Sequence, residues 1–132
     1  MQMEDFYTSD KAEEGAKLPL YKPNGEKTEH WFLVLGIDSP TFKKAEAQSK
    51  RKGAKIALIE DADERDEKGV ELERELVASL IKDWSFGTEC TMEEKIKFLK
   101  KAPQIESAVN RFSAQRTLFF AKESTASTNG SK

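Results

Sequence analysis

Few side chains in this sequence are suited to bond-making chemistry. Among its 132 residues, His30 is the only histidine and Cys90 the only cysteine. A Ser-His-Asp or Cys-His catalytic site would have to use them, and neither lies in a nucleophile motif. We therefore interpret His30 as a strand residue beside Trp31 and Cys90 as a partly buried thiol. The sequence predicts a protein that is not an enzyme.

Metal and cofactor sites are not indicated either. A zinc site needs three or four nitrogen or sulfur ligands, and one histidine and one cysteine supply too few. Asp61, Asp63 and Asp66 are close in sequence, but the glycine and the final glutamate of a calcium loop are not in register. We interpret the three acids as the acidic start of a helix. No glycine-rich phosphate loop or dinucleotide fingerprint is present, so we expect no cofactor.

Length and composition bound the class of protein. A chain of 132 residues with 35% charged and 37% hydrophobic residues is typical of one soluble, helix-rich domain. No apolar run approaches the roughly 20 residues of a membrane span, and the acidic N-terminus lacks the features of a signal peptide. A single cysteine excludes an intrachain disulfide, which favours a reducing, cytoplasmic location.

Charge is distributed in blocks of alternating sign. Residues 38–59 carry six basic against two acidic residues, residues 60–76 three against nine, and residues 91–122 seven against three. Such blocks are typical of solvated helix faces, or of a charged docking surface that includes self-association. The basic residues Lys95, Lys97, Lys100 and Lys101 also suggest nucleic-acid binding. The acidic pI of about 5.6 and the acidic block disfavour that alternative.

The N-terminal half predicts a flexible arm and a hairpin. Residues 1–16 are polar and are expected to form a flexible arm. Residues 17–22 and 30–36 favour two strands joined through the turn signal Asn24-Gly25, and Pro19 suggests that the first strand lies at an edge. We expect residues 17–122 to form a single globular domain and residues 123–132 a flexible Ser/Thr-rich tail.

Four helices are predicted to follow. Asp38 or Ser39 is suited to cap a helix that starts at Pro40, which Gly53 interrupts or ends. The pattern of residues 56–59 fits more helix or a short strand, and we favour helix. Residues 61–84 predict one long helix whose apolar stripe ends in Leu80, Ile81 and Trp84.

Two shorter helices complete this prediction. Thr91 and Glu94 form a capping box that opens a helix ending before Pro103. Pro103 then starts a last helix with an apolar stripe that extends to Phe120. The predicted fold class is therefore α+β and mainly helical: an N-terminal β-hairpin followed by about four helices packed as a small bundle.

Aromatic residues gather toward the C-terminal end at helical spacing. The default interpretation of Trp84, Phe112, Phe119 and Phe120 is a hydrophobic core. Phe119 and Phe120 are adjacent and therefore point about 100° apart on a helix. A small bundle can bury one of them and leave the other half-exposed beside Leu118, where it would serve as a partner anchor.

Several segments together resemble a known family. They are Leu35 to Ala45 after the hairpin, Leu80 to Ser85, Cys90-Thr-Met-Glu, and Ala102 to Phe112. Their order and spacing resemble the tail assembly chaperones of long, non-contractile-tailed bacteriophages, over about residues 18–122. The resemblance implies a non-enzymatic protein that binds the helical tape measure protein, keeps it soluble and helps recruit tail tube subunits.

The resemblance also implies where such a protein acts. It would work in the host cell cytoplasm and be absent from the mature virion, and a frameshifted longer product would recruit the tail tube protein. Binding a helical client needs an apolar groove with a charged rim. Our hypothesis is that this groove is lined or bordered by the following residues: Trp84, Phe112, Leu118, Phe119 and Phe120. A virion structural protein of the minor tail or head–tail joining type is the competing interpretation, and a nucleic-acid-binding protein is a weaker one.

Overall fold

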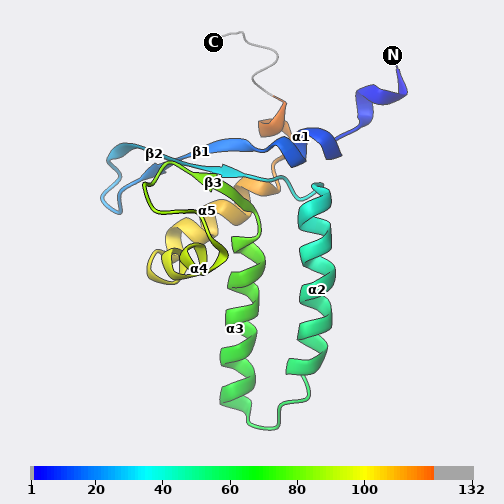
Figure 1. Ribbon diagram of the computed structural model, residues 1–132, viewed down its shortest axis with the longest axis vertical. Helices are drawn as coiled ribbons and strands as arrows, with labels where there is room; N and C mark the ends of the chain where they lie inside the picture. The colour runs from blue at the N-terminus through cyan, green and yellow to red at the C-terminus, as the bar shows by residue number, and fades with distance from the viewer. Residues whose placement is uncertain (1, 121–132) are drawn as a thin grey trace.

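The computed structural model describes residues 2–120 and shows a mainly helical α+β fold with an N-terminal β-hairpin, as the sequence predicts (Figure 1). Its elements follow in chain order: η1 Met3–Phe6, α1 Ser9–Glu14, β1 Ala16–Tyr21, β2 Lys27–Val34, α2 Pro40–Ile56, α3 Ala62–Ala78, β3 Ile81–Trp84, α4 Met92–Lys101, α5 Pro103–Ser113 and η2 Arg116–Phe119. The expected tail at residues 123–132 lies outside the described residues. Each helix within the described range is too short or too polar to cross a membrane.

The sheet is antiparallel with the strand order β1-β2-β3. The predicted turn joins β1 to β2, and Gly25 adopts a φ of 91° there, a conformation that favours glycine. Pro19 lies on β1 opposite Trp31, so the proline is on an edge strand as expected.

The third strand corrects the prediction of one helix over residues 61–84. Helix α3 ends at Ala78, and the chain turns and enters the sheet, where the Leu35 amide donates to the Leu80 carbonyl at 2.7 Å. Phe32 pairs with Trp84, but an irregularity shifts the register before Val34 pairs with Ile81. Ile81 and Trp84 are therefore both buried although they are three residues apart. A bulged strand thus produced the spacing that we interpreted as helical.

The N-terminal segment differs from the expected flexible arm over residues 1–16. Its helix α1 packs on the body of the protein: Ala12 is buried and its carbonyl accepts a hydrogen bond from the Gly36 amide at 3.0 Å. The Glu13 carboxylate accepts hydrogen bonds from the Ser39 hydroxyl and from the Thr41 amide and hydroxyl at the start of α2. These bonds lower the pKa of Glu13. From Ser9 onward, the segment belongs to the fold.

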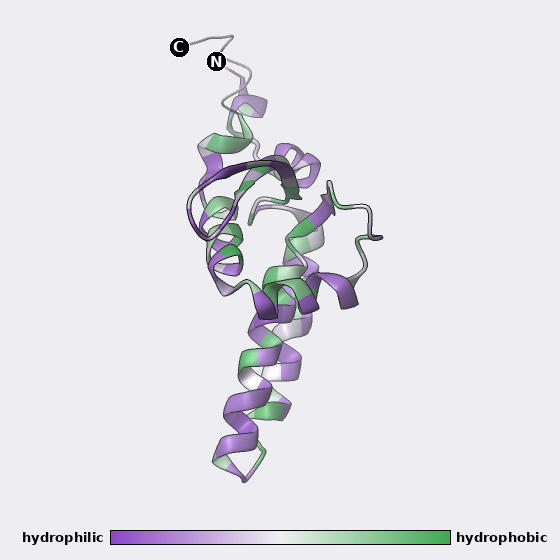
Figure 2. Cartoon of the chain, turned by 90° about the vertical axis from the view of Figure 1, so that its left-hand side faces the viewer, coloured by the Kyte–Doolittle hydropathy of each residue, from purple (hydrophilic) through white to green (hydrophobic). Residues whose placement is uncertain are grey.

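Helices α2 and α3 form an antiparallel arm that extends away from the rest of the molecule, with its connecting loop at the far end (Figure 1). Each helix has 17 residues, so the arm is about 25 Å long. Helix α2 continues through Gly53 and ends at Ile56, so the glycine does not interrupt it and Leu58 lies in the loop. Figure 2 shows that the arm is largely hydrophilic. One ion pair, Lys52–Glu75 at 2.8 Å, links its two helices.

The C-terminal region corrects a second helix boundary. The start at Pro103 is confirmed, but α5 ends at Ser113 and does not extend to Phe120. The Ser113 carbonyl accepts from the Ile37 amide at 3.1 Å, so it is engaged by another part of the fold. Arg116 then forms two hydrogen bonds with Asp38, which hold η2 against the loop after β2.

The core lies between the sheet and the helices α3, α4 and α5. Its fully buried side chains include Phe32, Val34, Leu80, Ile81, Leu99 and Val109. Helix α2 contributes Phe42, and α3 contributes Val77 and Ala78 from its last turn. The burial is therefore concentrated at the base of the arm, where α3, α4 and α5 pack against one another and against the sheet.

Candidate functional site: an aromatic groove between β3 and α4

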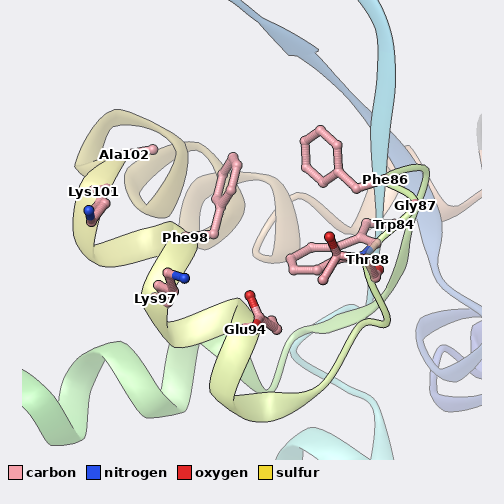
Figure 3. Close-up of a pocket in the computed structure, with 9 residues that line it drawn as sticks. All are labelled: Trp84, Phe86, Gly87, Thr88, Glu94, Lys97, Phe98, Lys101 and Ala102. Atoms are coloured by element: carbon pink, nitrogen blue, oxygen red, sulfur yellow. The ribbon is translucent and has the colours of Figure 1, made fainter.

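A hollow with a mainly apolar lining lies between the chain that follows β3 and helix α4 (Figure 3). We call it the aromatic groove, and its volume is about 460 Å³. Trp84 and Phe86 contribute one side, and Phe98 contributes the other. Its complete lining is Trp84, Phe86, Gly87, Thr88, Glu94, Lys97, Phe98, Lys101 and Ala102.

The strand side is held by hydrogen bonds that orient its rings. The Trp84 indole Nε1 donates to the Thr88 carbonyl at 2.6 Å, which fixes the ring across the loop. The Ser85 amide donates to the Trp31 carbonyl at 3.1 Å, and the Ser85 hydroxyl accepts from the Trp31 amide at 2.9 Å. The Phe86 ring lies 5.4 Å from that of Trp84, in an edge-to-face arrangement. The positions of these rings are therefore fixed by contacts within the protein.

The helix side follows from the capping of α4. Thr91 is its N-cap, and its hydroxyl accepts from the Glu94 amide at 3.1 Å, which confirms the predicted start. Glu94, Phe98 and Lys101 are spaced four and three residues apart and so share one face. The Phe98 ring lies 5.4 Å from both Phe86 and the buried Phe32, so it joins the groove to the core.

A lysine also ties α4 to the sheet. Lys95 Nζ donates to the Ile81 carbonyl at 2.8 Å, and its burial lowers its pKa. This lysine is therefore not a free member of the basic patch considered for nucleic-acid binding. This bond joins α4 directly to β3.

The rim of the groove is mainly basic. Lys97 and Lys101 are exposed beside the apolar lining, while Glu94 is partly buried among the lining residues. Within residues 2–120, neither lysine forms an ion pair. The site therefore combines an aromatic floor with unpaired positive charge at its edge.

The five residues of our partner-binding hypothesis do not lie in one place. Trp84 lines the aromatic groove. Phe112 and Leu118 border a different hollow beside Ala16 and Leu33. Phe119 is only 5% exposed and its ring lies 5.8 Å from Phe112.

Phe120 is partly buried and lies next to the Asp38–Arg116 pair, away from the groove. The expectation that one of the two adjacent phenylalanines is buried and the other partly exposed agrees with these positions. They come, however, from a 3₁₀ turn and its end, and not from one continuous helix.

Phe86 and Phe98 line the groove but are not among the partner-binding residues that the sequence predicts. Trp84 and Phe86 are separated by one residue, which is the spacing of one strand face, whereas the apolar spacing of residues 61–84 predicts a helix through Trp84. Phe98 lies between Lys97 and Leu99 on α4, and the sequence analysis assigns it no partner-binding role. The available signal was the pair of spacings Trp84–Phe86 and Phe98–Ala102.

His30 and Cys90, the groups considered for catalysis, both contact other parts of the fold. His30 Nδ1 and Ser85 Oγ are 2.9 Å apart, and the His30 ring packs on Phe86 at 4.5 Å. Cys90 is partly buried, and burial raises the pKa of its thiol, the opposite of what activates a nucleophile. Within the part of the chain that the structure describes, no cluster of three or more His, Cys, Asp or Glu residues is arranged to hold a metal ion.

The fold defines this protein as a mainly helical α+β protein with a three-stranded antiparallel sheet and a projecting helical arm. Comparisons with protein-family models, with curated proteins and with solved structures find no match.

Proposed function

We propose that this protein is a non-enzymatic binding module whose aromatic groove takes the apolar face of an amphipathic helix. The observation that carries the proposal is the groove itself, in which Trp84, Phe86 and Phe98 line a hollow bordered by two unpaired lysines. Its volume of about 460 Å³ lies within the range of about 300–1,000 Å³ that is usual for ligand sites. Helix-in-groove recognition uses apolar anchors of this kind.

The rim suggests which helices are favoured. Lys97 and Lys101 are one helical turn apart and would face acidic residues on the flanks of a bound helix. Burying one leucine or phenylalanine of the client contributes about 1.5–3 kcal/mol, while an exposed ion pair contributes at most about 1 kcal/mol. Apolar anchors would therefore provide most of the affinity, and charge would select the client and speed its binding.

Within this class, we propose a tail assembly chaperone of a long, non-contractile-tailed bacteriophage. Its client would be the tape measure protein, which it would keep soluble in the host cell cytoplasm, and it would help recruit tail tube subunits through a longer frameshifted product. The sequence resemblance over residues 18–122 supports this assignment. The groove supports it physically, because a long helical client exposes apolar faces that need temporary cover.

Co-expression with the tape measure protein tests the proposal. The double variant Lys97→Glu/Lys101→Glu is expected to lose the soluble complex, because it removes no core atoms but places two negative charges against the acidic flanks of the client, and such like-charge contacts cost several kcal/mol. Lys100→Glu is the matched control, since Lys100 is exposed on the same helix but does not line the groove. If the double variant folds and keeps the client as soluble as the unchanged protein does, the groove is not the client site.

Mass spectrometry of purified particles separates the chaperone from a virion structural protein. A chaperone is expected in infected cells and absent from particles. Detection at a stoichiometric level in particles would instead favour the minor tail or head–tail joining alternative.

A further inference from the structure

The far end of the arm presents an apolar side chain in a fixed position. Leu58, in the loop between α2 and α3, is 81% exposed and is the most exposed large hydrophobic residue of the described chain. Its amide donates to the Lys55 carbonyl at 3.1 Å, and the next amide, of Ile59, donates to the Ile56 carbonyl at 3.0 Å. Arg65 Nη1 donates to the Ile59 carbonyl at 2.9 Å. The loop is thus braced on both sides of the exposed leucine.

Acidic residues follow this leucine at once. Glu60, Asp61, Asp63 and Glu64 lie within six residues of Leu58, at the start of α3. Asp61 caps the helix by accepting from the Glu64 amide at 3.0 Å. Over residues 2–120, no ion pair neutralises any of the four. We call residues 57–64 the arm tip: an exposed aliphatic side chain flanked by unpaired negative charge.

The arm tip and the aromatic groove are complementary in apolar surface and in charge. The groove offers an aromatic floor where the tip offers Leu58, and it has unpaired Lys97 and Lys101 where the tip has unpaired carboxylates. We propose that the arm tip of one copy of this chain docks into the aromatic groove of a second copy. This inference rests on the proposed function, because it also treats the groove as a binding site. The arm tip of a second copy would compete with the client for that site.

The contact must form between copies. The tip lies at the end of an arm about 25 Å long, whereas the groove is part of the body at the other end of α3, so the chain cannot reach its own groove (Figure 1). Tip and groove are different surfaces, so one contact leaves one groove and one tip free. Two copies either exchange tips in a closed dimer or continue as a chain. A client helix in the groove would displace the tip, so self-association and client binding exclude each other.

Sedimentation velocity over a range of protein concentrations tests the proposal at low salt. The unchanged protein is expected to form species larger than the monomer. Leu58→Asp, in the tip, is expected to weaken association at least about tenfold, as the loss of one buried leucine implies. Lys97→Glu/Lys101→Glu, in the groove, is expected to weaken association at least as much, because it places two negative charges against the acidic arm tip. Val70→Asp is the matched control: Val70 is 53% exposed on the same arm but lies outside the tip. It is expected to associate as the unchanged protein does.

Mixing the two defective proteins gives the sharpest result. Leu58→Asp keeps its groove and Lys97→Glu/Lys101→Glu keeps its tip, so a 1:1 mixture is expected to form a dimer through one unaltered contact and to associate more strongly than either protein alone. Circular dichroism confirms that each variant is folded. Wild-type protein that stays monomeric at high concentration and low salt would overturn the proposal. So would a Leu58→Asp variant that associates normally, or a mixture that stays monomeric.

The same proteins separate this inference from the proposed function. If Leu58→Asp abolishes association and still keeps the tape measure protein soluble, both proposals stand. If the unchanged protein is monomeric and the groove variant loses the client, only the self-association is wrong. If the tip and groove variants abolish association and the groove variant still keeps the client soluble, only the client site is wrong.

Discussion

Substitution of Gly36 by alanine tests whether α1 is packed as the structure shows. A Cβ atom at this position would lie 2.9 Å from Ala12 Cβ, 3.3 Å from Ala12 Cα and 3.4 Å from Phe119 Cε2. The first distance is too short, and the second involves backbone, so α1 must move and its hydrogen bond with the Gly36 amide must weaken. Overpacking of this kind costs about 1–3 kcal/mol. At about 4 °C per kcal/mol for a domain of this size, we expect Gly36→Ala to lower Tm by about 4–12 °C.

Thermal unfolding followed by circular dichroism measures this shift, and two further variants control it. Ala12→Gly removes the Cβ that would clash, so adding it to Gly36→Ala is expected to cost less than the sum of the two single changes. Gly69→Ala, in α3, meets no atom within 4 Å and replaces a helical glycine. It is expected to stabilise the protein by about 0.5–1 kcal/mol.

The result that would refute the packing is an unchanged or raised Tm for Gly36→Ala. The expectation of a flexible arm over residues 1–16 would then stand. If Gly36→Ala lowers Tm and adding Ala12→Gly does not restore part of the loss, residue 36 is strained by a contact other than the one with α1.

Three further predictions concern the loop after β2 and helix α4. The Arg116 hydrogen bonds lower the pKa of Asp38 from 3.8 to about 2, so the stability that this pair contributes is present above pH 4 and is lost as the pH falls toward 2. Asp38→Asn is therefore expected to flatten the dependence of Tm on pH between pH 4 and 2. An unchanged slope would contradict this prediction. Thr91→Ala removes the N-cap of α4 and is expected to cost about 0.5–2 kcal/mol in urea unfolding, while an unchanged midpoint would show that the cap does not stabilise the helix. Burial raises the pKa of the Cys90 thiol. Cys90 is therefore expected to react with a thiol reagent more slowly at pH 7 than a small-molecule thiol does, and to react faster as the pH rises. Equal rates at pH 7 would contradict the burial.

Local signals in the sequence predicted the starts of elements well. Thr91 and Pro103 opened helices where the structure has them, and the Asn24-Gly25 turn placed the hairpin. Ser39 is confirmed as the N-cap of α2 through its bond with the Phe42 amide at 3.2 Å. These features depend on neighbours within a few residues, so they can be read from the sequence.

The ends of elements depended on distant parts of the chain. Nothing near Ser113 stops a helix by composition, and α5 ends where the Ile37 amide engages the Ser113 carbonyl. Similarly, α3 gives way to β3 because the Leu80 carbonyl accepts from Leu35 and the strand completes the sheet. A hydrogen bond across 45 or more residues leaves no periodicity in the sequence.

The same irregular strand explains why the candidate site was only partly predicted. Trp84 was selected as the end of a helical stripe, and a helix would have turned residue 86 away from it. In β3 and the chain after it, Trp84 and Phe86 instead lie 5.4 Å apart, ring to ring, and face Phe98. Among the C-terminal phenylalanines, in contrast, Phe112 and Phe119 pack against each other. The aromatic surface left for a partner therefore comes from the sheet edge and α4, which places the proposed client and the proposed arm tip in competition for the same three rings.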